Sequence, residues 1–318
     1  MHRLLLPLLA LLLLAAAALV LALVFGGPGD PGVMPSINNP FRSVDFSRLP
    51  GLSRFPARDG AQLACRAYPP APGPARGTVV LVHGSSASSN SMHVLARALA
   101  AAGHAVYSLD IRGHGESGTR GRIAYIGQLE DDLEDFLGAV RPSRPLTLSG
   151  FSSGGGFTLR FAGSARQQLF DRYLLLSPYL GPTAPTSRRG SGGWVKVGVP
   201  RMIAIAMLNA AGVRACNDLP VLRFALDPQA RRLLTPQYSF TLAANFGPPR
   251  DYRACIRAVN QPMRLVAGQD DEAMVPARYQ EVFRAEGKDV PVTLVPGVGH
   301  IPLILAPEAV AAVVEQAR

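Results

Sequence analysis

The chain has 318 residues, a net charge of +10 and 48% hydrophobic residues, which is ample apolar material for the core of an α/β domain. Of its 32 basic residues only Lys196 and Lys288 are lysines, and the arginines are scattered without basic-aromatic blocks, which argues against nucleic acid as a partner. The three cysteines have no metal-ligand spacing, so the sequence predicts no metal site.

The first predicted element is Leu4–Phe25, a stretch without a charged or strongly polar side chain. As a helix it would span roughly 33 Å at about 1.5 Å per residue, matching a hydrocarbon core of about 30 Å. Arg3 and the α-amino group precede it and no basic residue follows until Arg42, which predicts a cytoplasmic N-terminus and an exported remainder. Residues 1–25 are therefore interpreted as a membrane anchor. The alternative is a signal peptide cleaved near Ala15-Ala16-Ala17, followed by secretion.

Residues 26–50 are rich in Gly, Pro and Asn without periodicity, which predicts a linker. From residue 51 onward, short β-prone runs alternate with helical stretches. The predicted strands are Thr78–Val82, Ala105–Leu109, Leu146–Leu148, Tyr173–Leu176, Met263–Val266 and Val292–Val295. This alternation predicts an α/β domain over residues 51–318, with a mostly parallel central sheet and helices on both faces.

Two further helices stand out. Ile126–Val140 has apolar residues three and four apart and five acidic residues on its other face, which we interpret as a solvated helix face rather than a metal site. Pro307 begins a last helix. The alternation stops over residues 178–261, where the chain is rich in Pro, Arg and Ala and shows no strand-like run. This segment predicts a helical cap inserted between strands 6 and 7.

Gly150-Phe151-Ser152-Ser153-Gly154 is a G-x-S-x-G motif between a predicted strand and a helix-compatible stretch. A nucleophilic serine on a tight strand-to-helix turn has a strained backbone and needs neighbours without bulk, which the two glycines provide. No lysine follows the glycines, so the motif is not a phosphate-binding loop. The pattern predicts Ser152 as a nucleophile, and a plain glycine-rich turn is the alternative.

A nucleophilic serine needs a base, and the base needs a carboxylate that fixes its tautomer. Among the six histidines, His300 lies in the loop after the last predicted strand, where a sheet of this kind brings it beside the serine turn. Asp271 lies in the loop after the preceding strand and completes the chain order Ser, Asp, His. Asp270 remains an alternative to it.

Negative charge that develops on a substrate oxygen needs hydrogen-bond donors. Val82-His83-Gly84-Ser85 ends the first strong predicted strand. The backbone N–H groups of Ser85 and Ser153 are therefore the predicted oxyanion hole. His83 is expected to orient this loop by hydrogen bonds.

These motifs, with the Asp-Ile-Arg-Gly-His-Gly-Glu-Ser segment at Asp110–Ser117, resemble the α/β-hydrolase branch of monoacylglycerol lipases, lysophospholipases and serine aminopeptidase-like hydrolases. The resemblance covers everything after the predicted linker. It implies the α/β-hydrolase fold and ester hydrolysis through an acyl-enzyme, without a metal or cofactor. This chain departs from the family twice: Ser85-Ser86 stands where many relatives have a second glycine, and the acid loop is one residue longer than usual.

The expected function is hydrolysis of small or lipid-like esters, such as monoacylglycerols or lysophospholipids, by a membrane-tethered and exported enzyme. The alternatives are a serine amidase or aminopeptidase, and an inactive hydrolase domain that serves as a binding module. Trp194–Gly212 is the most apolar part of the cap, and is expected to form its core, line an acyl pocket or dip into the membrane interface. Cys216 and Cys255, both in the cap, are the expected disulfide pair, and three buried free thiols are the alternative.

Overall fold

The computed structural model describes residues 2–318, and for residues 2–6 the backbone alone. An eight-stranded sheet has the order β1-β2-β4-β3-β5-β6-β10-β11, and every pair from β4 to β11 is parallel. The strands are β1 (Leu52–Pro56), β2 (Gln62–Tyr68), β3 (Thr78–Val82), β4 (Ala105–Leu109), β5 (Leu146–Phe151), β6 (Arg172–Leu176), β10 (Met263–Gly268) and β11 (Val292–Val295). The predicted mostly parallel sheet is confirmed.

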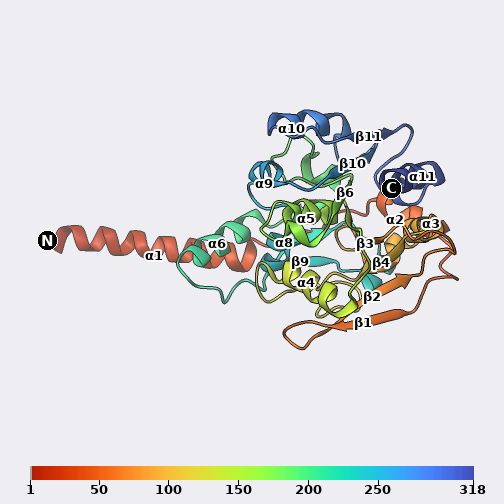
Figure 1. The fold of residues 1–318 in the computed structure, drawn as a ribbon. Helices are drawn as coiled ribbons and strands as arrows, with labels where there is room; N and C mark the ends of the chain where they lie inside the picture. Colours follow the sequence, from red (N-terminus) through yellow and green to blue (C-terminus); the bar gives the residue numbers. More distant parts are fainter. Residues whose placement is uncertain (1) are drawn as a thin grey trace.

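Helices cover this sheet on both faces, because its central strands are buried throughout and need apolar cover on either side. The helices are α3 (His93–Ala101), α4 (Gln128–Val140), α5 (Ser153–Ala162), α9 (Tyr252–Ala258), α10 (Tyr279–Ala285) and α11 (Pro307–Gln316). In Figure 1 the sheet stands between α4, α5 and α9 on one side and α3 and α11 on the other. Because β5, β10 and β11 run parallel to one another, their carboxyl ends lie at the same edge of the sheet.

The acidic face of α4, which was expected to be solvated, is partly buried. Glu130 and Asp132 are buried rather than solvated, because each pairs with an arginine from another element. Asp132 lies 2.7 Å from Arg112, and Glu130 lies 2.6 Å from Arg160 of α5. Buried carboxylates of this kind are stable only when a cation and hydrogen bonds compensate for lost water.

Residues 178–261 form an insertion between β6 and β10, the sixth and seventh strands of the large sheet in chain order. The expected helical segment is helical only in part. The insertion contains a three-stranded antiparallel sheet, β7 (Val195–Val197), β8 (Pro220–Phe224) and β9 (Gln237–Ser239). It also contains α6 (Val199–Ala210), α7 (Pro228–Leu233), α8 (Phe240–Asn245) and α9. β7 and β9 have three residues each with a polar residue among them, and β8 begins with a proline and contains an arginine, so none forms the apolar run from which a strand is predicted.

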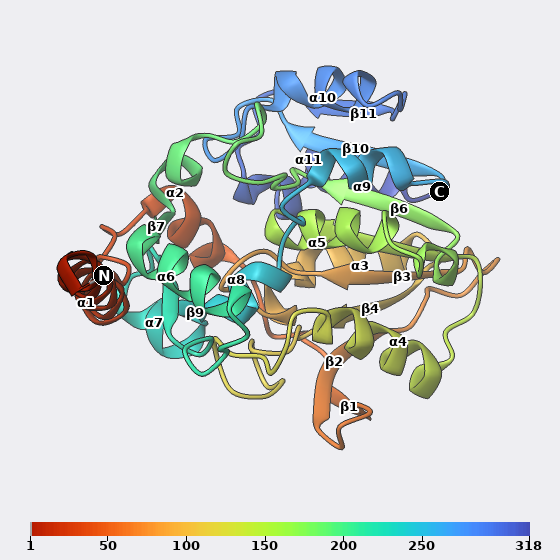
Figure 2. The ribbon, with the colours of Figure 1, turned by 90° about the vertical axis from the view of Figure 1, so that its left-hand side faces the viewer.

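The N-terminal residues form α1 (His2–Phe25), which extends away from the rest of the protein in Figure 1. Over Pro7–Phe25 it is long and apolar enough to cross a membrane, with mean hydropathy 3.1 and no residue buried in the structure. The α-amino group and the side chain of Arg3, on which the predicted orientation depends, lie outside the described residues. The end of α1 packs against α6 of the insertion, and Figure 2 shows the two helices side by side.

The predicted linker contains a short helix, α2 (Pro35–Asn38), and is held against the insertion. The backbone N–H of Met34 donates to the carbonyl oxygen of Ala225 at 3.1 Å, and the Asn38 side chain donates to the same oxygen at 2.9 Å. These bonds fix a segment whose composition alone predicts only flexibility.

The three cysteines are free thiols, so the expected Cys216–Cys255 disulfide does not form. Cys255 on α9 packs against Gly163 at the end of α5, whereas Cys216 lies in the loop that follows α6. Of the three only Cys65, on β2, is buried, so the alternative of three buried thiols also fails.

Candidate active site

Ser152 occupies a sharp turn between β5 and α5, with backbone dihedrals φ +56° and ψ −118°. This region is strained for a residue with a side chain and persists only when the surroundings enforce it. The turn leaves no space at Gly150 or Gly154: a Cβ would lie 2.1 Å from the Gly154 oxygen or 2.4 Å from the His83 oxygen. Both glycines of the motif are thus required by contact with the backbone.

The structure brings three predicted site residues together from three loops at the carboxyl ends of β5, β10 and β11. The Oγ of Ser152 lies 3.0 Å from Nε2 of His300, and Nδ1 of His300 lies 2.7 Å from Oδ2 of Asp271. All three side chains are buried. In this arrangement the imidazole can take a proton from the serine hydroxyl while the carboxylate stabilises the resulting charge.

Asp271, rather than Asp270, faces His300. Its other oxygen, Oδ1, accepts the backbone N–H groups of Ala273 and Met274, each at 2.8 Å. Burial acts to raise the pKa of Asp271, but the His300 ring and the hydrogen bond from the Met274 N–H act against it, and the pKa is held below its ordinary value. Asp270 is exposed to solvent. The extra residue in this loop therefore leaves Asp271 in contact with the histidine.

Comparison with known proteins places this geometry in a family. A family model described as serine aminopeptidase, S33, matches residues 73–304, which contain all three residues of the site. The chain belongs to the serine aminopeptidase S33 family. A monoacylglycerol lipase from Mycolicibacterium smegmatis is 30% identical over 240 residues, which are 71% of this chain and 81% of that protein.

Solved structures show that this S33-family chain has the α/β-hydrolase fold. A soluble variant of monoglyceride lipase from Saccharomyces cerevisiae, solved with a substrate analogue, has a TM-score of 0.63 at 19% identity, over 84% of this chain and 93% of that one. A membrane phospholipase A described as a bacterial virulence factor has a TM-score of 0.55 at 21% identity, over 100% of this chain and 99% of that one. Both identities are low, so these two likenesses concern the fold.

The predicted oxyanion loop of this family member lies directly against Ser152. A Cβ added to Gly84 would lie 3.4 Å from the Cβ of Ser152. Within residues 2–318, the N–H of Ser85 donates to no protein acceptor. Ser153 is the first residue of α5, where a backbone N–H has no partner inside the helix. Both predicted donors are therefore free to bind an oxygen.

His83 orients the oxyanion loop by hydrogen bonds, as expected. Its Nδ1 lies 2.7 Å from the carbonyl oxygen of Gly84, and because a carbonyl only accepts, this nitrogen carries the hydrogen. Its Nε2 then accepts the N–H of Ile111 at 3.2 Å. Burial lowers the pKa of His83, which favours this neutral form.

The Asp110–Ser117 segment is a structural loop beside the site. The carboxylate of Asp110 accepts the N–H of Ser89 at 2.7 Å and of Glu116 at 2.9 Å, so it ties two loops together. The Oγ of Ser117 accepts the N–H of Ala64 at 2.8 Å. This S33 motif thus supports the site without supplying a reacting group.

Sequence reasoning missed the residues of the insertion that touch the oxyanion loop. Trp194 donates from Nε1 to the Oγ of Ser85 at 2.8 Å, and Tyr238 accepts the N–H of Ser86 at 2.5 Å. The contacts join positions more than 100 residues apart, so no local pattern indicates them. The one available signal is that Trp194 is the single tryptophan of the chain.

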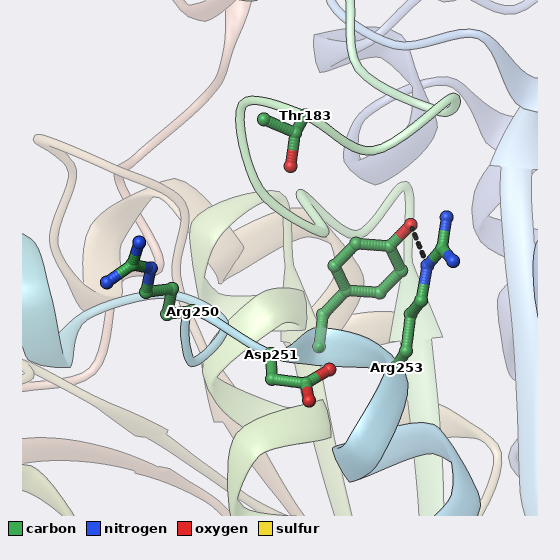
Figure 3. Close-up of a pocket in the computed structure, with 5 residues that line it drawn as sticks. Thr183, Arg250, Asp251 and Arg253 are labelled. Atoms are coloured by element: carbon green, nitrogen blue, oxygen red, sulfur yellow. Dashed lines mark hydrogen bonds between the residues drawn. The ribbon is translucent and has the colours of Figure 1, made fainter.

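The insertion also contains a hollow of about 460 Å³ that is separate from this site. Its lining residues are Thr183, Arg250, Asp251, Tyr252 and Arg253 (Figure 3). No residue of the Ser152 site lines it, and Arg253 donates to the Tyr252 hydroxyl at 3.4 Å beside it. Ser152 itself is only 7% exposed, so little of its surface is open to solvent.

Proposed function

We propose that the protein is a serine hydrolase that cleaves carboxylic esters through an acyl-enzyme. The observation that carries this proposal is the hydrogen-bonded chain from the Ser152 hydroxyl through His300 to Asp271. A nucleophile within hydrogen-bond reach of a base that a third group orients is the structural signature of covalent catalysis. The hydrolases among its relatives support the assignment to enzymes.

In the proposed mechanism, Ser152 Oγ attacks the acyl carbonyl carbon while His300 Nε2 takes its proton. The carboxylate of Asp271 stabilises the imidazolium, and the N–H groups of Ser85 and Ser153 bind the oxyanion. His300 then gives the proton to the leaving alcohol, and the acyl group remains on Ser152. A water molecule activated by His300 attacks the acyl-enzyme and releases the acid.

The proposed substrates are amphiphilic esters such as monoacylglycerols or lysophospholipids. One support is the relative from Mycolicibacterium smegmatis, which is named a monoacylglycerol lipase. A second is the apolar surface on and beside α6, next to α1. Its exposed members are Val197, Val199, Ile203, Met207 and Val213. Apolar surface beside a hydrophobic helix suits a substrate that resides in a lipid layer.

For the chain as a whole we propose a membrane anchor at residues 1–25, a linker at 26–50 and a hydrolase domain at 51–318, exported from the cytoplasm. The insertion, at about 178–261, is the proposed cap over the site. The long apolar helix α1 supports the anchor, and a cleaved signal peptide is the alternative. Membrane fractionation that resists carbonate, together with protease access from outside, supports the anchor; a mature N-terminus near Ala18 contradicts it.

A serine aminopeptidase on the same three residues is the second candidate, because the matching family model carries that description. The two functions differ in leaving group and in the need to bind a free amino terminus. A panel of p-nitrophenyl esters of increasing chain length, run beside aminoacyl p-nitroanilides, separates them. We expect hydrolysis of the esters and little release from the anilides.

The test of the enzyme itself is covalent labelling by a fluorophosphonate. The label is expected on Ser152 in the wild-type protein and absent from Ser152→Ala, which should also lose activity by a factor on the order of 10⁶. His300→Ala should be about as damaging. Activity near that of the wild type in either variant contradicts the roles proposed for Ser152 and His300, whereas an inactive and unlabelled wild-type protein favours a binding module.

A further inference from the structure

The insertion holds the two residues that follow Gly84 in the oxyanion loop. The indole of Trp194 donates to Ser85 Oγ, and the hydroxyl of Tyr238 accepts the N–H of Ser86. Thr235 forms two more bonds: its N–H donates to the Ser86 carbonyl at 2.9 Å, and its own carbonyl accepts from Ser86 Oγ at 2.7 Å. Every polar group of Ser86 is thus bound by the insertion.

Ser86 needs this support because its backbone has φ +69°, a left-handed conformation that is uncommon for residues other than glycine. A conformation of this kind costs of order 1–3 kcal/mol and persists only where neighbouring groups enforce it. The three bonds to Thr235 and Tyr238 supply that enforcement.

The direction of the Tyr238 bonds can be assigned. Nδ1 of His114 lies 3.2 Å from the Ile111 carbonyl oxygen and so carries the hydrogen, which leaves Nε2 as an acceptor. The Tyr238 hydroxyl, 2.6 Å away, donates to Nε2 and is free to accept from Ser86. Burial raises the pKa of Tyr238 and lowers that of His114, so both groups stay neutral and this order of donors is kept.

These bonds fix the peptide planes on both sides of the Ser85 Cα atom. His83 binds the carbonyl of the Gly84–Ser85 peptide, and because that peptide is planar and trans, the Ser85 N–H points the opposite way. Tyr238 binds the N–H of the next peptide, Ser85–Ser86. The core therefore sets one plane and the insertion sets the other.

We propose that Tyr238, assisted by Trp194, is a positioning residue that holds the Ser85 end of the peptide whose N–H, oriented by His83, binds the oxyanion. This inference rests on the proposed serine hydrolase function. The insertion then does more than cover the site: the oxyanion hole is complete only while the insertion is docked on the loop. Loss of one anchor should weaken binding of the transition state while leaving binding of the ground state intact.

The test uses Tyr238→Phe in the full chain, because this change removes one oxygen atom and keeps the ring. With a short p-nitrophenyl ester, kcat should fall about ten- to hundredfold while KM stays within about twofold. This loss in kcat is no larger than the loss caused by removing a whole oxyanion-hole donor. The affinity for a trifluoromethyl ketone, which forms an oxyanion adduct with Ser152, should fall by the same factor. Trp194→Phe, which keeps the stacking on Phe224, should show a smaller loss of the same kind.

The matched control is Tyr173→Phe, because Tyr173 is equally buried and its hydroxyl donates to the Gln167 carbonyl at 2.8 Å, away from the loop. Amide hydrogen exchange in residues 84–88 should quicken in Tyr238→Phe and not in this control. Unchanged kcat and ketone affinity in Tyr238→Phe, or equal losses in both variants, overturn the inference alone. A wild-type protein that neither turns over esters nor reacts with fluorophosphonate overturns the proposed function instead.

Discussion

Oδ2 of Asp271 lies 2.7 Å from Nδ1 of His300, while the adjacent carboxylate of Asp270 faces solvent. Asp271→Asn should therefore lower kcat by about 10⁴, because the amide favours the wrong histidine tautomer. Asp270→Asn should stay within about tenfold of the wild type and serves as the matched control. Ester hydrolysis at saturating substrate measures both, and the opposite ranking would assign the acid to Asp270.

The serine turn should tolerate no side chain at its glycines. In Gly150→Ala the new Cβ would lie 2.1 Å from the Gly154 carbonyl oxygen, so the backbone must move and the variant should lose both stability and labelling of Ser152. Gly138→Ala on α4 is the control: nothing lies within 4 Å, and alanine favours helix by about 1 kcal/mol. Thermal unfolding of the two variants should shift in opposite directions, and similar shifts would contradict this account of the turn.

Stability should decrease as the solution becomes acidic, starting near pH 6.5. Burial lowers the pKa of His83 and His114, so below pH 6.5 the unfolded chain binds protons that the folded chain does not. The free energy of unfolding then falls by about 1.4 kcal/mol per pH unit for each such histidine. Asp271, whose folded pKa is lowered, contributes to this loss only below its ordinary value of 3.8.

Urea titrations between pH 7 and pH 5 measure this slope. In His114→Gln, one titrating group is removed, so the slope should be shallower by about 1.4 kcal/mol per pH unit, whatever the change in absolute stability. An unchanged slope would mean that His114 is protonated in the folded protein and that the assigned order of donors around Tyr238 is wrong.

The exposed side of α6 should matter for substrates held in a lipid layer. Met207 is 61% exposed, so Met207→Asp should leave folding intact, yet impair hydrolysis of long-chain esters in vesicles by about tenfold or more. Soluble acetate or butyrate esters should be hydrolysed at the normal rate, because the site is untouched. Leu294→Asp, on β11 at the far edge of the sheet, is the control, and equal effects of both changes on vesicle substrates would refute a role for α6.

Arg201 should hold α1 to the insertion. Its guanidinium donates to the carbonyls of Leu23 at 2.7 Å and Val24 at 2.8 Å, where the helix leaves acceptors unpaired. Arg201→Met should raise the protease sensitivity of residues 26–32 severalfold in detergent while short-ester hydrolysis continues. Arg201→Lys keeps the charge without the planar fork and should be intermediate. Cleavage at the wild-type rate in Arg201→Met would show that the contact holds nothing.

The features that could be predicted from the sequence are those that depend on a continuous run of residues or on the order of motifs along the chain. Strands β3, β4 and β11 were predicted with their observed ends, since strand residues form short apolar runs, and the order Ser152, Asp271, His300 predicts their meeting at one sheet edge. The insertion sheet escaped prediction because β8 begins with a proline and gains its order only from pairing with β7 and β9.

Side-chain contacts between residues far apart in the sequence could not be predicted either. Glu130 and Asp132 have the spacing of a solvated face, and only the arrival of Arg160 and Arg112 makes their burial possible. The contacts of Trp194 and Tyr238 with the oxyanion loop likewise depend on how the insertion folds back on the sheet. Such contacts decide how the site is held, and they have no counterpart in local sequence.

The attachment of α1 and of the segment after it has a mechanical consequence. Arg201, Met34 and Asn38 all join the N-terminal region to the insertion. With α1 embedded in a bilayer, as proposed, these contacts would keep the insertion close to the lipid surface. A substrate that leaves the lipid layer would then meet the insertion before it meets the large sheet that carries Ser152 (Figure 1).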